Sequence, residues 1–402
     1  MVQMSTDARL TALLDVTQLP TASGKEWRVH HYIRQWAARR PELSLGEDQA
    51  GNLLVSIRGI KSDEPPLFIT AHTDHPAFVI EKITDARRVE LSFRGGVMDV
   101  FFDHTPITIH THDNVTFGAI ITEELKDGSP AGKHYLAELD RPADATGMLA
   151  VGDIATWMLP PAEIGDDGLV HTWACDDLSA LAAALCAMDD LLAKRRAGET
   201  TLDVRLLFTR AEEIGFVGAI AACKFGTMPK GSRVLALENS RAFADSPLGA
   251  GPIVRVGDRL SVFTPWLTSA CAARAEELFG GPATPTASQS IKVAPKRAWQ
   301  RKLMAGGACE ASVYCHAGYD ATCLCLPLGN YHNMPHLAEL QAGTYDSLQL
   351  GPPRAAREVN HVDDYHGLID LLVGLGQKLP SPAAATARFD KLYTERAYVL
   401  NT

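Results

Sequence analysis

Hydrophobic and polar positions alternate along this chain in two ways, and the change between them divides the sequence. Residues 10–14 and 27–38 have the spacing of amphipathic helices, whereas 52–58 and 66–71 are short, continuous apolar runs. Such runs are typical of buried strands. After Trp173 the same alternation returns, with helices predicted over ALAAALCAMDDLLAKRR, TPWLTSACAARAEELFG and YHGLIDLLVGLGQKL and strands over VRLLFTR, RVLALEN and CLCLPLG. These two parts predict an α/β domain.

The stretch from about Pro76 to Thr172 has a different pattern of apolar and polar residues. Its short β-branched segments, VELSF, ITIHTH, FGAIIT and DIATWML, are separated by Gly, Asp and Pro, with no long helical pattern between them. This pattern predicts a small β-barrel or sandwich. We therefore expect an α/β/α sandwich with a mixed central sheet, formed by residues 1–75 and 172–402, and interrupted by a barrel-like all-β insertion domain at 76–171.

Composition narrows the function classes. The 402 residues are 46% hydrophobic and 21% charged, which is typical of a globular enzyme, and the formal net charge is −10. Nucleic acids and acidic membranes select basic patches, so neither is an expected partner. The sequence has no signal-peptide pattern and no apolar run long enough to span a membrane, so a cytoplasmic location is expected. The eight cysteines form no CxxC pair, and we interpret them as reduced, mostly buried thiols.

Polar residues that can bind metals follow directly after the predicted strands. His72 and Asp74 lie on one face of an extended segment, so His72 could bind zinc while Asp74 holds its other ring nitrogen. Asp176 and Asp177 precede a helix, and two aspartates exceed what a helix cap needs. One of the two is therefore free to bridge a pair of cations.

Three further strand ends carry the same kind of residue. Glu212 and Glu213 follow a strand as adjacent acids, and a metal would relieve their repulsion, with one as ligand and the other as general base. Glu238 and His332 each end another apolar strand. Singly, each feature also fits a surface pair, a helix cap or a solvated helix start. Together they supply His, Asp, Glu, Glu and His, a ligand mix that zinc accepts, and predict a two-metal hydrolytic site with the ions roughly 3.5–4 Å apart.

Several motifs then resemble one family, the tetrahedral (deblocking or glutamyl) aminopeptidases, which are dinuclear zinc enzymes. AHTDH is similar to that family's AHxDE, ACDDLSA to its DDRxG or DNRxG, and RAEEIGFVGA to its EExGxxGA. SPLGAGPIVRVGD, AGYDAT and LPLGNYHNM also resemble family motifs, and the β-rich insertion lies where the family carries one. The resemblance covers about residues 20 to 375.

The resemblance implies specific roles. Asp176 would bridge two zinc ions, with cobalt and manganese as alternative metals, and the Asp176–Asp177 peptide would be cis. His72 and Glu238 would complete one metal's ligands, and Glu213 and His332 those of the other. The resemblance further makes Glu212 the general base, with Asp74 as the partner of His72, in an aminopeptidase acting on peptides. It also implies a homo-oligomer, either a dimer or a dodecameric cage.

The sequence departs from the family at positions that border the expected substrate pocket: Leu178, Gly329-Asn330, His75 and Glu238. The substrate therefore stays open, and an N-acyl amino acid deacylase with the same metal core and a catalytically inactive oligomeric binding protein are the alternatives. Tyr319 and Asp320 are further candidates for shaping the pocket. His336 is the nearest rival of His332, and ordinary surface or core roles are expected for His104, His110 and His112.

Overall fold

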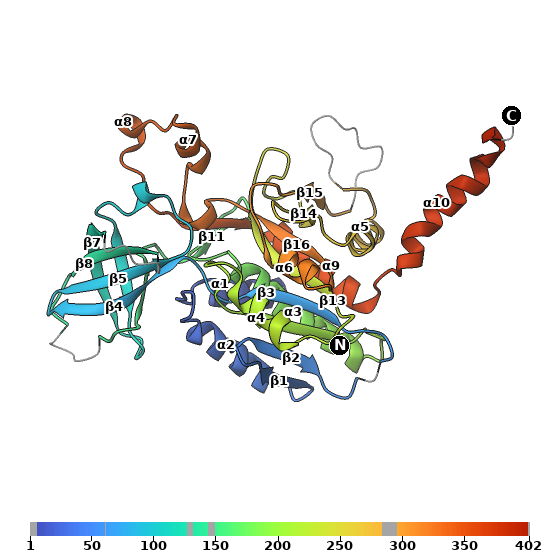
Figure 1. Cartoon of the computed structure of the whole chain (residues 1–402), viewed down its shortest axis with the longest axis horizontal. Helices are drawn as coiled ribbons and strands as arrows, with labels where there is room; N and C mark the ends of the chain where they lie inside the picture. Colours follow the sequence, from blue (N-terminus) through green and yellow to red (C-terminus); the bar gives the residue numbers. More distant parts are fainter. Residues whose placement is uncertain (1–5, 61, 127–131, 144–148, 284–295, 401–402) are drawn as a thin grey trace.

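A mixed eight-stranded sheet forms the centre of the larger part of the chain (Figure 1). The computed structural model describes residues 6–60, 62–126, 132–143, 149–283 and 296–400. Within them the strand order is β1 (Leu43–Glu47), β2 (Leu53–Ile57), β12 (Val204–Thr209), β3 (Leu67–His72), β13 (Arg233–Arg241), β16 (Asp320–Leu328), β14 (Ile253–Gly257) and β15 (Gln300–Leu303). The four strands β12, β3, β13 and β16 are mutually parallel, so their carboxyl ends meet at one edge.

Helices cover both faces of this sheet because its central strands are apolar on both sides. In β3 the side chains of Leu67 and Ile69 face one core and Phe68 faces the other. The first core is closed by α1 (Thr6–Thr17), α2 (Trp27–Ala38), α3 (Leu178–Arg196), α5 (Pro265–Phe279) and α9 (Val362–Gln377). The second is closed by α4 (Val217–Phe225) and α6 (Glu310–His316).

The β-rich segment forms a closed antiparallel barrel, seen at the left of Figure 1. Its strands follow the order β4 (Ala77–Asp85), β5 (Arg88–Arg94), β8 (Lys133–Leu139), β7 (Thr116–Leu125), β6 (Pro106–His110) and β9 (Ile154–Trp157), and a 3-10 turn, η1 (Asp99–Phe101), connects β5 to β6. Apolar side chains such as Phe78 and Phe117 fill its interior. The predicted fold class, an α/β/α sandwich with an inserted barrel, is confirmed.

A small third sheet lies outside the barrel. β10 (Glu163–Ile164) pairs with β11 (Leu169–Thr172), and β11 pairs with β17 (Glu358–His361), almost two hundred residues further along the chain. The range 76–171 thus contains β10 and most of β11, which belong to a sheet that the C-terminal strand β17 completes. The division of the chain into 1–75 with 172–402 and 76–171 stays a prediction.

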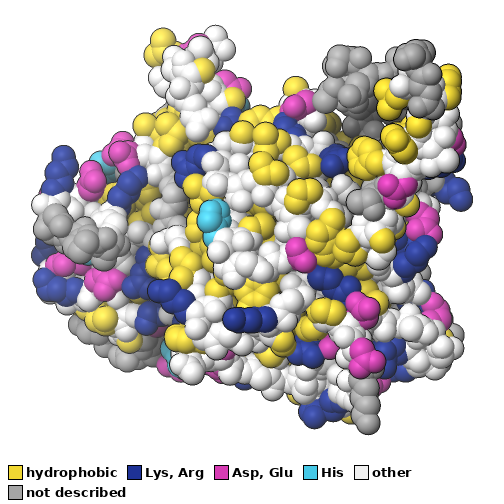
Figure 2. Space-filling model, turned by 45° about the vertical axis from the view of Figure 1, so that its right-hand side comes forward, with side chains coloured by type: hydrophobic (Ala, Val, Ile, Leu, Met, Phe, Trp, Pro, Cys, Tyr) yellow, Lys and Arg dark blue, Asp and Glu magenta, His cyan; other side chains and the backbone are white. Residues whose placement is uncertain are grey.

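The C-terminal third contains two helical segments that extend away from the central sheet. After the turn η2 (Tyr331–Asn333), the short helices α7 (Leu337–Ala342) and α8 (Ser347–Leu350) extend beside the barrel, whereas α10 (Pro382–Arg396) and the turn η3 (Ala397–Leu400) project from the body at the upper right of Figure 1. On the face drawn in Figure 2, basic and acidic side chains are interspersed. No helix among the described residues combines the length and apolar character needed to cross a membrane.

Candidate metal centre

All five predicted metal ligands lie together at the carboxyl edge of the parallel strands. His72 is the last residue of β3, Glu213 follows β12, Glu238 lies near the end of β13, and His332 follows β16. Asp176 precedes α3, whose amino end points at the same edge. Three overlapping groups of side chains have ligand atoms within 4.8 Å of one another: His72, Asp176 and Glu238; Asp176, Glu213 and His332; and His72, Glu212 and Glu213.

Asp176 occupies the middle of the cluster. Its Oδ1 lies 3.3 Å from Nε2 of His72, and its Oδ2 lies 3.5 Å from Nε2 of His332. These separations exceed the roughly 2.7–2.9 Å of a charge-assisted hydrogen bond. The carboxylate thus turns one oxygen toward each of two histidines, as a ligand that bridges two cations must. The peptide between Asp176 and Asp177 is cis.

Asp74 contacts the backbone and side chains that surround Asp176. Its Oδ1 accepts a hydrogen bond from the backbone N–H of Glu212 (2.9 Å), and its Oδ2 accepts one from the N–H of Glu213 (3.1 Å) and one from the Ser23 hydroxyl (2.5 Å). Nδ1 of His72 lies 3.5 Å from Oδ1 and 3.1 Å from the carbonyl oxygen of Asp74. One buried aspartate therefore orients the imidazole and the adjacent acid pair.

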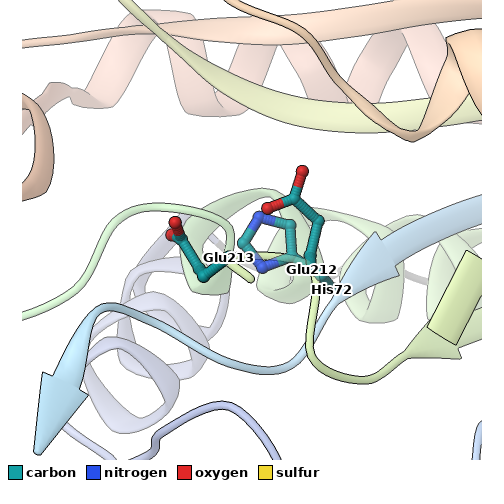
Figure 3. A group of neighbouring side chains, drawn as sticks. All are labelled: His72, Glu212 and Glu213. Carbon is teal, nitrogen blue, oxygen red and sulfur yellow. The ribbon is translucent and has the colours of Figure 1, made fainter. Parts of the chain in front are cut away.

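Glu212 and Glu213 extend beside His72 from the loop after β12 (Figure 3). Burial raises the pKa of both carboxyls, and the nearby acids raise it further. Burial likewise raises the pKa of Glu238, with Asp176 adding to the effect. Burial alone would lower the pKa of His72, but the surrounding carboxylates raise it well above its usual value. Such crowding of like charge favours protons or a cation at this position.

His332 is held from two directions. Its Nδ1 lies 2.7 Å from the carbonyl oxygen of Gly96, in the connection that follows barrel strand β5, which leaves Nε2 free to face Asp176 and Glu213. Two residues further along, Met334 packs into the barrel core. The barrel thus supplies the contact that orients this predicted ligand of the sandwich, and such a contact is typical of metal-binding histidines.

Sequence reasoning missed two buried acids at this site. Glu358, on β17, accepts hydrogen bonds from the backbone N–H groups of Cys175 (2.6 Å), Asp176 (3.0 Å) and His332 (2.7 Å). Burial raises its pKa to about 8. Glu310, the first residue of α6, accepts a hydrogen bond from the Tyr314 hydroxyl at 3.2 Å, and burial raises its pKa to about 7.

A local signal existed for one of these acids only. Small residues, Gly306 and Gly307, come before the acid Glu310, which is followed by Ala311. The segment AGYDA has the same order: small residues, then an acid, then Ala. Glu358 follows no apolar run, so nothing in its surroundings distinguishes it from a surface glutamate.

Other candidates lie elsewhere. The prediction that Tyr319 and Asp320 shape the pocket is wrong, because Asp320 begins β16 at the opposite edge of the sheet, and the Tyr319 hydroxyl donates to the carbonyl of Met228. His336 is exposed and contacts Tyr345 edge-on. His75 is buried behind the centre, with Nδ1 2.6 Å from the carbonyl oxygen of Asp176. The barrel histidines pair with neighbours outside the centre: His104 with Asp103, His110 with Thr156 and His112 with Trp27.

Two buried carboxylate oxygens without hydrogen-bond partners indicate which kind of group this cluster can bind. Oδ1 of Asp176 and Oε1 of Glu213 are buried and have no hydrogen-bond partner. An unpaired buried carboxylate oxygen is costly, and such groups are normally paired or bind metals. With two imidazole nitrogens among oxygen donors, the residues fit zinc, cobalt or manganese.

Comparison with known proteins gives a consistent result. Residues 51–278 match the sequence pattern of the M42 glutamyl aminopeptidase family. The TET1 peptidase of Pyrococcus horikoshii, described as assembling into a tetrahedron or a large octahedral shell, has a similar structure with a TM-score of 0.69 at 19% identity, over 92% of this chain and 100% of that one.

Two further solved structures are similar. Aminopeptidase APDkam598 of Desulfurococcus kamchatkensis has a TM-score of 0.71 at 17% identity, over 95% and 98% of the two chains. A protein of Thermotoga maritima described as an endoglucanase has a TM-score of 0.59 at 18% identity, over 90% and 96%. At these identities the structures show a shared fold. No curated protein sequence matches the chain.

Proposed function

The chain belongs to the M42 glutamyl aminopeptidase family, and from this premise we propose that it is a metal-dependent aminopeptidase that removes N-terminal residues from peptides. The observation that carries the proposal is Asp176, which turns its two oxygens toward two different histidines. A single-metal hydrolase has no need of a second histidine and a further carboxylate on the far side of one aspartate.

We propose His72, Asp176 and Glu238 as the ligands of one zinc ion, and Asp176, Glu213 and His332 as those of the other. Asp74 positions His72 and the acid pair. A bound zinc pair would lower the pKa of water toward about 7 and stabilise negative charge that develops on the amide oxygen.

Glu212 is the proposed general base. It carries no ligand role in this scheme, its backbone is anchored by Asp74, and its carboxyl lies beside His72 (Figure 3). Because burial raises its pKa, the carboxylate is a stronger base than a solvated glutamate. Glu212 would take a proton from the attacking water and return it to the leaving amine.

Two substitutions test this division of roles. Glu212→Gln should lower kcat by about 10²–10⁴-fold and retain both metals, because it removes only the base. Glu213→Gln, a matched change one residue away, should lose one metal. Metal content by mass spectrometry and hydrolysis of aminoacyl-nitroanilides are the measurements. Substantial activity in Glu212→Gln would overturn the assignment.

The same assay separates the alternatives. A deacylase would cleave N-acyl amino acids in preference to aminoacyl-nitroanilides, and an inactive binding protein would cleave neither, with or without added zinc. The match of residues 51–278 to a glutamyl aminopeptidase family favours the aminopeptidase.

Two further expectations complete the proposal. The chain forms a homo-oligomer, as the solved relatives described as a dodecamer or a tetrahedron do. Its location is the cytoplasm, which the eight free cysteines support because thiols persist in reducing compartments.

A further inference from the structure

The C-terminal arm, defined as α10 with the turn η3 (residues 382–400), projects from the body of the molecule (Figure 1). None of its described side chains is buried. The preceding helix, α9, is by contrast buried along most of its length. The arm contacts α5, but this contact buries none of the arm's described side chains.

Local signals start this helix but do not account for its stability. Ser381 caps it by accepting from the N–H of Ala384, and Pro382 occupies the first turn. An isolated helix of about 12–15 residues is nevertheless marginal in water, because most helical stability in proteins comes from packing an apolar face. The contact with α5 leaves the arm's apolar side chains exposed, so the arm still needs a partner that covers them.

The arm carries an apolar face that could receive one. Phe389 and Tyr393 lie one turn apart and are each 68% exposed, and Tyr398, Val399 and Leu400 continue at 73%, 55% and 71%. Together they expose on the order of 600 Å² of largely apolar side chain, against about 800 Å² per partner in a standard protein interface. A patch of this size marks an interaction site.

The chemistry of the arm favours a protein as the occupant. Residues 382–400 include three basic and two acidic residues, a near balance that gives no attraction to nucleic acid or an acidic membrane. Aromatic side chains are enriched at protein interfaces. Apolar side chains are also grouped on the body of the molecule, on the face drawn in Figure 2, so a second copy offers apolar surface as well.

We propose that the C-terminal arm is an assembly element that packs against a second copy of this chain through Phe389, Tyr393 and the side chains of η3. The inference rests on the proposed self-assembly and is independent of the proposed hydrolysis. The arm lies at the opposite end of the chain's fold from the barrel (Figure 1), so its loss leaves the metal ligands untouched.

The test compares two matched double variants of the full chain. Phe389→Glu/Tyr393→Glu places two charges on the apolar face, and Ala387→Glu/Thr394→Glu places two charges on the opposite face of the same helix. Sedimentation velocity measures the mass, and zinc content measures the integrity of the centre. A chain ending at Pro380 provides a third variant in which the arm is absent.

We expect the wild-type chain to form an assembly. The mass of the apolar-face variant and of the truncated chain should be lower than the wild-type mass by about two-fold or more, and the opposite-face variant should keep the wild-type mass. Zinc content should be equal in all four. An apolar-face variant with wild-type mass would overturn the arm's role and leave the proposed self-assembly standing. A wild-type chain that is monomeric at every concentration measured would overturn both the arm's role and the proposed self-assembly, whatever its hydrolytic activity.

Discussion

Asp74 determines the local geometry of the centre although it binds no metal in the proposed scheme. It accepts from two successive backbone N–H groups, of Glu212 and Glu213, and from Ser23 while facing His72. Asp74→Asn keeps the size of the side chain but replaces one acceptor with a donor, so one of these contacts becomes repulsive. We expect metal affinity to fall by about 10–100-fold, measured by competition with a chromophoric chelator.

Ser23→Ala is the control for that substitution. It removes one donor to Asp74 and leaves the histidine and the acid pair in place, so its effect on affinity should be several-fold smaller. Equal effects of the two variants would mean that Asp74 acts through the Ser23 contact alone.

Glu310 gives the metal-free protein a pH-dependent stability. Burial raises its pKa from 4.5 to about 7, so the folded state holds this proton after the unfolded state has lost it. Its contribution is complete below pH about 4.5 and is lost as the pH rises through about 7. Glu310→Gln should remove up to about 3 kcal/mol of the fall in unfolding free energy between pH 5 and pH 8, measured by denaturation in the presence of chelator.

Tyr314→Phe tests whether the acid itself is responsible. This variant keeps the carboxyl and deletes the hydroxyl that donates to it, so the fall between pH 5 and pH 8 should persist. A Glu310→Gln protein whose pH dependence equals that of the wild type would contradict the assignment.

At the scale of elements, the loop after β16 connects the barrel to the centre. It carries His332, whose Nδ1 faces the Gly96 carbonyl, and then Met334 and Leu337, which both enter the barrel core. His332, Asn333 and His336 all have positive φ, so the loop holds a sparsely populated backbone shape that its surroundings must maintain. Of the two side chains that enter the barrel core, Met334 lies nearer in sequence to His332, the proposed ligand.

Met334→Ala should therefore lower the affinity of one metal about ten-fold in addition to destabilising the barrel by roughly 2–5 kcal/mol. Leu337→Ala, which empties the same core three residues further on, should lower stability alone. Zinc titration and denaturant unfolding separate the two effects. Wild-type metal affinity in Met334→Ala would show that the barrel does not position His332.

The strand pattern explains which parts of the fold and site the sequence could predict. Apolar runs that end in His72, Glu213 and Glu238 identify parallel strands, and parallel strands bring their carboxyl ends to one edge whatever their order. The ligand cluster therefore follows from local patterns. The prediction for Asp320 failed for a related reason, because that residue begins β16 and so lies at the opposite edge of the sheet from the strand ends.

Non-local pairing explains what the sequence could not predict. Glu358 reaches Asp176 across 182 positions and sits on a four-residue strand, EVNH, with no apolar run to reveal it. The Gly96 carbonyl is a backbone atom and leaves no mark on the sequence. Such contacts depend on how the barrel and the sandwich pack, which local periodicity does not encode.

At the scale of the whole molecule, the centre concentrates negative charge that the fold does not balance by itself. Eight buried carboxyls surround two histidines at one sheet edge: Asp74, Asp176, Asp177, Glu212, Glu213, Glu238, Glu310 and Glu358. In the metal-free protein, protons must occupy several of them, as the raised pKa of Glu212, Glu213 and Glu238 indicates. Two divalent cations would supply the missing positive charge.

Removing metal should therefore lower Tm, and the loss should be larger at pH 8 than at pH 5.5, because fewer protons replace the cations at the higher pH. Restoring free zinc to 100 times its Kd stabilises the folded state by about 2.7 kcal/mol per site. Calorimetry with chelator and then with zinc measures both changes. Glu212→Gln should respond like the wild type, whereas His332→Ala, which lacks one ligand set, should recover about half of the stabilisation. A Tm that chelation leaves unchanged at pH 8 would mean that the fold tolerates this cluster without cations, and the two-metal assignment would then fail.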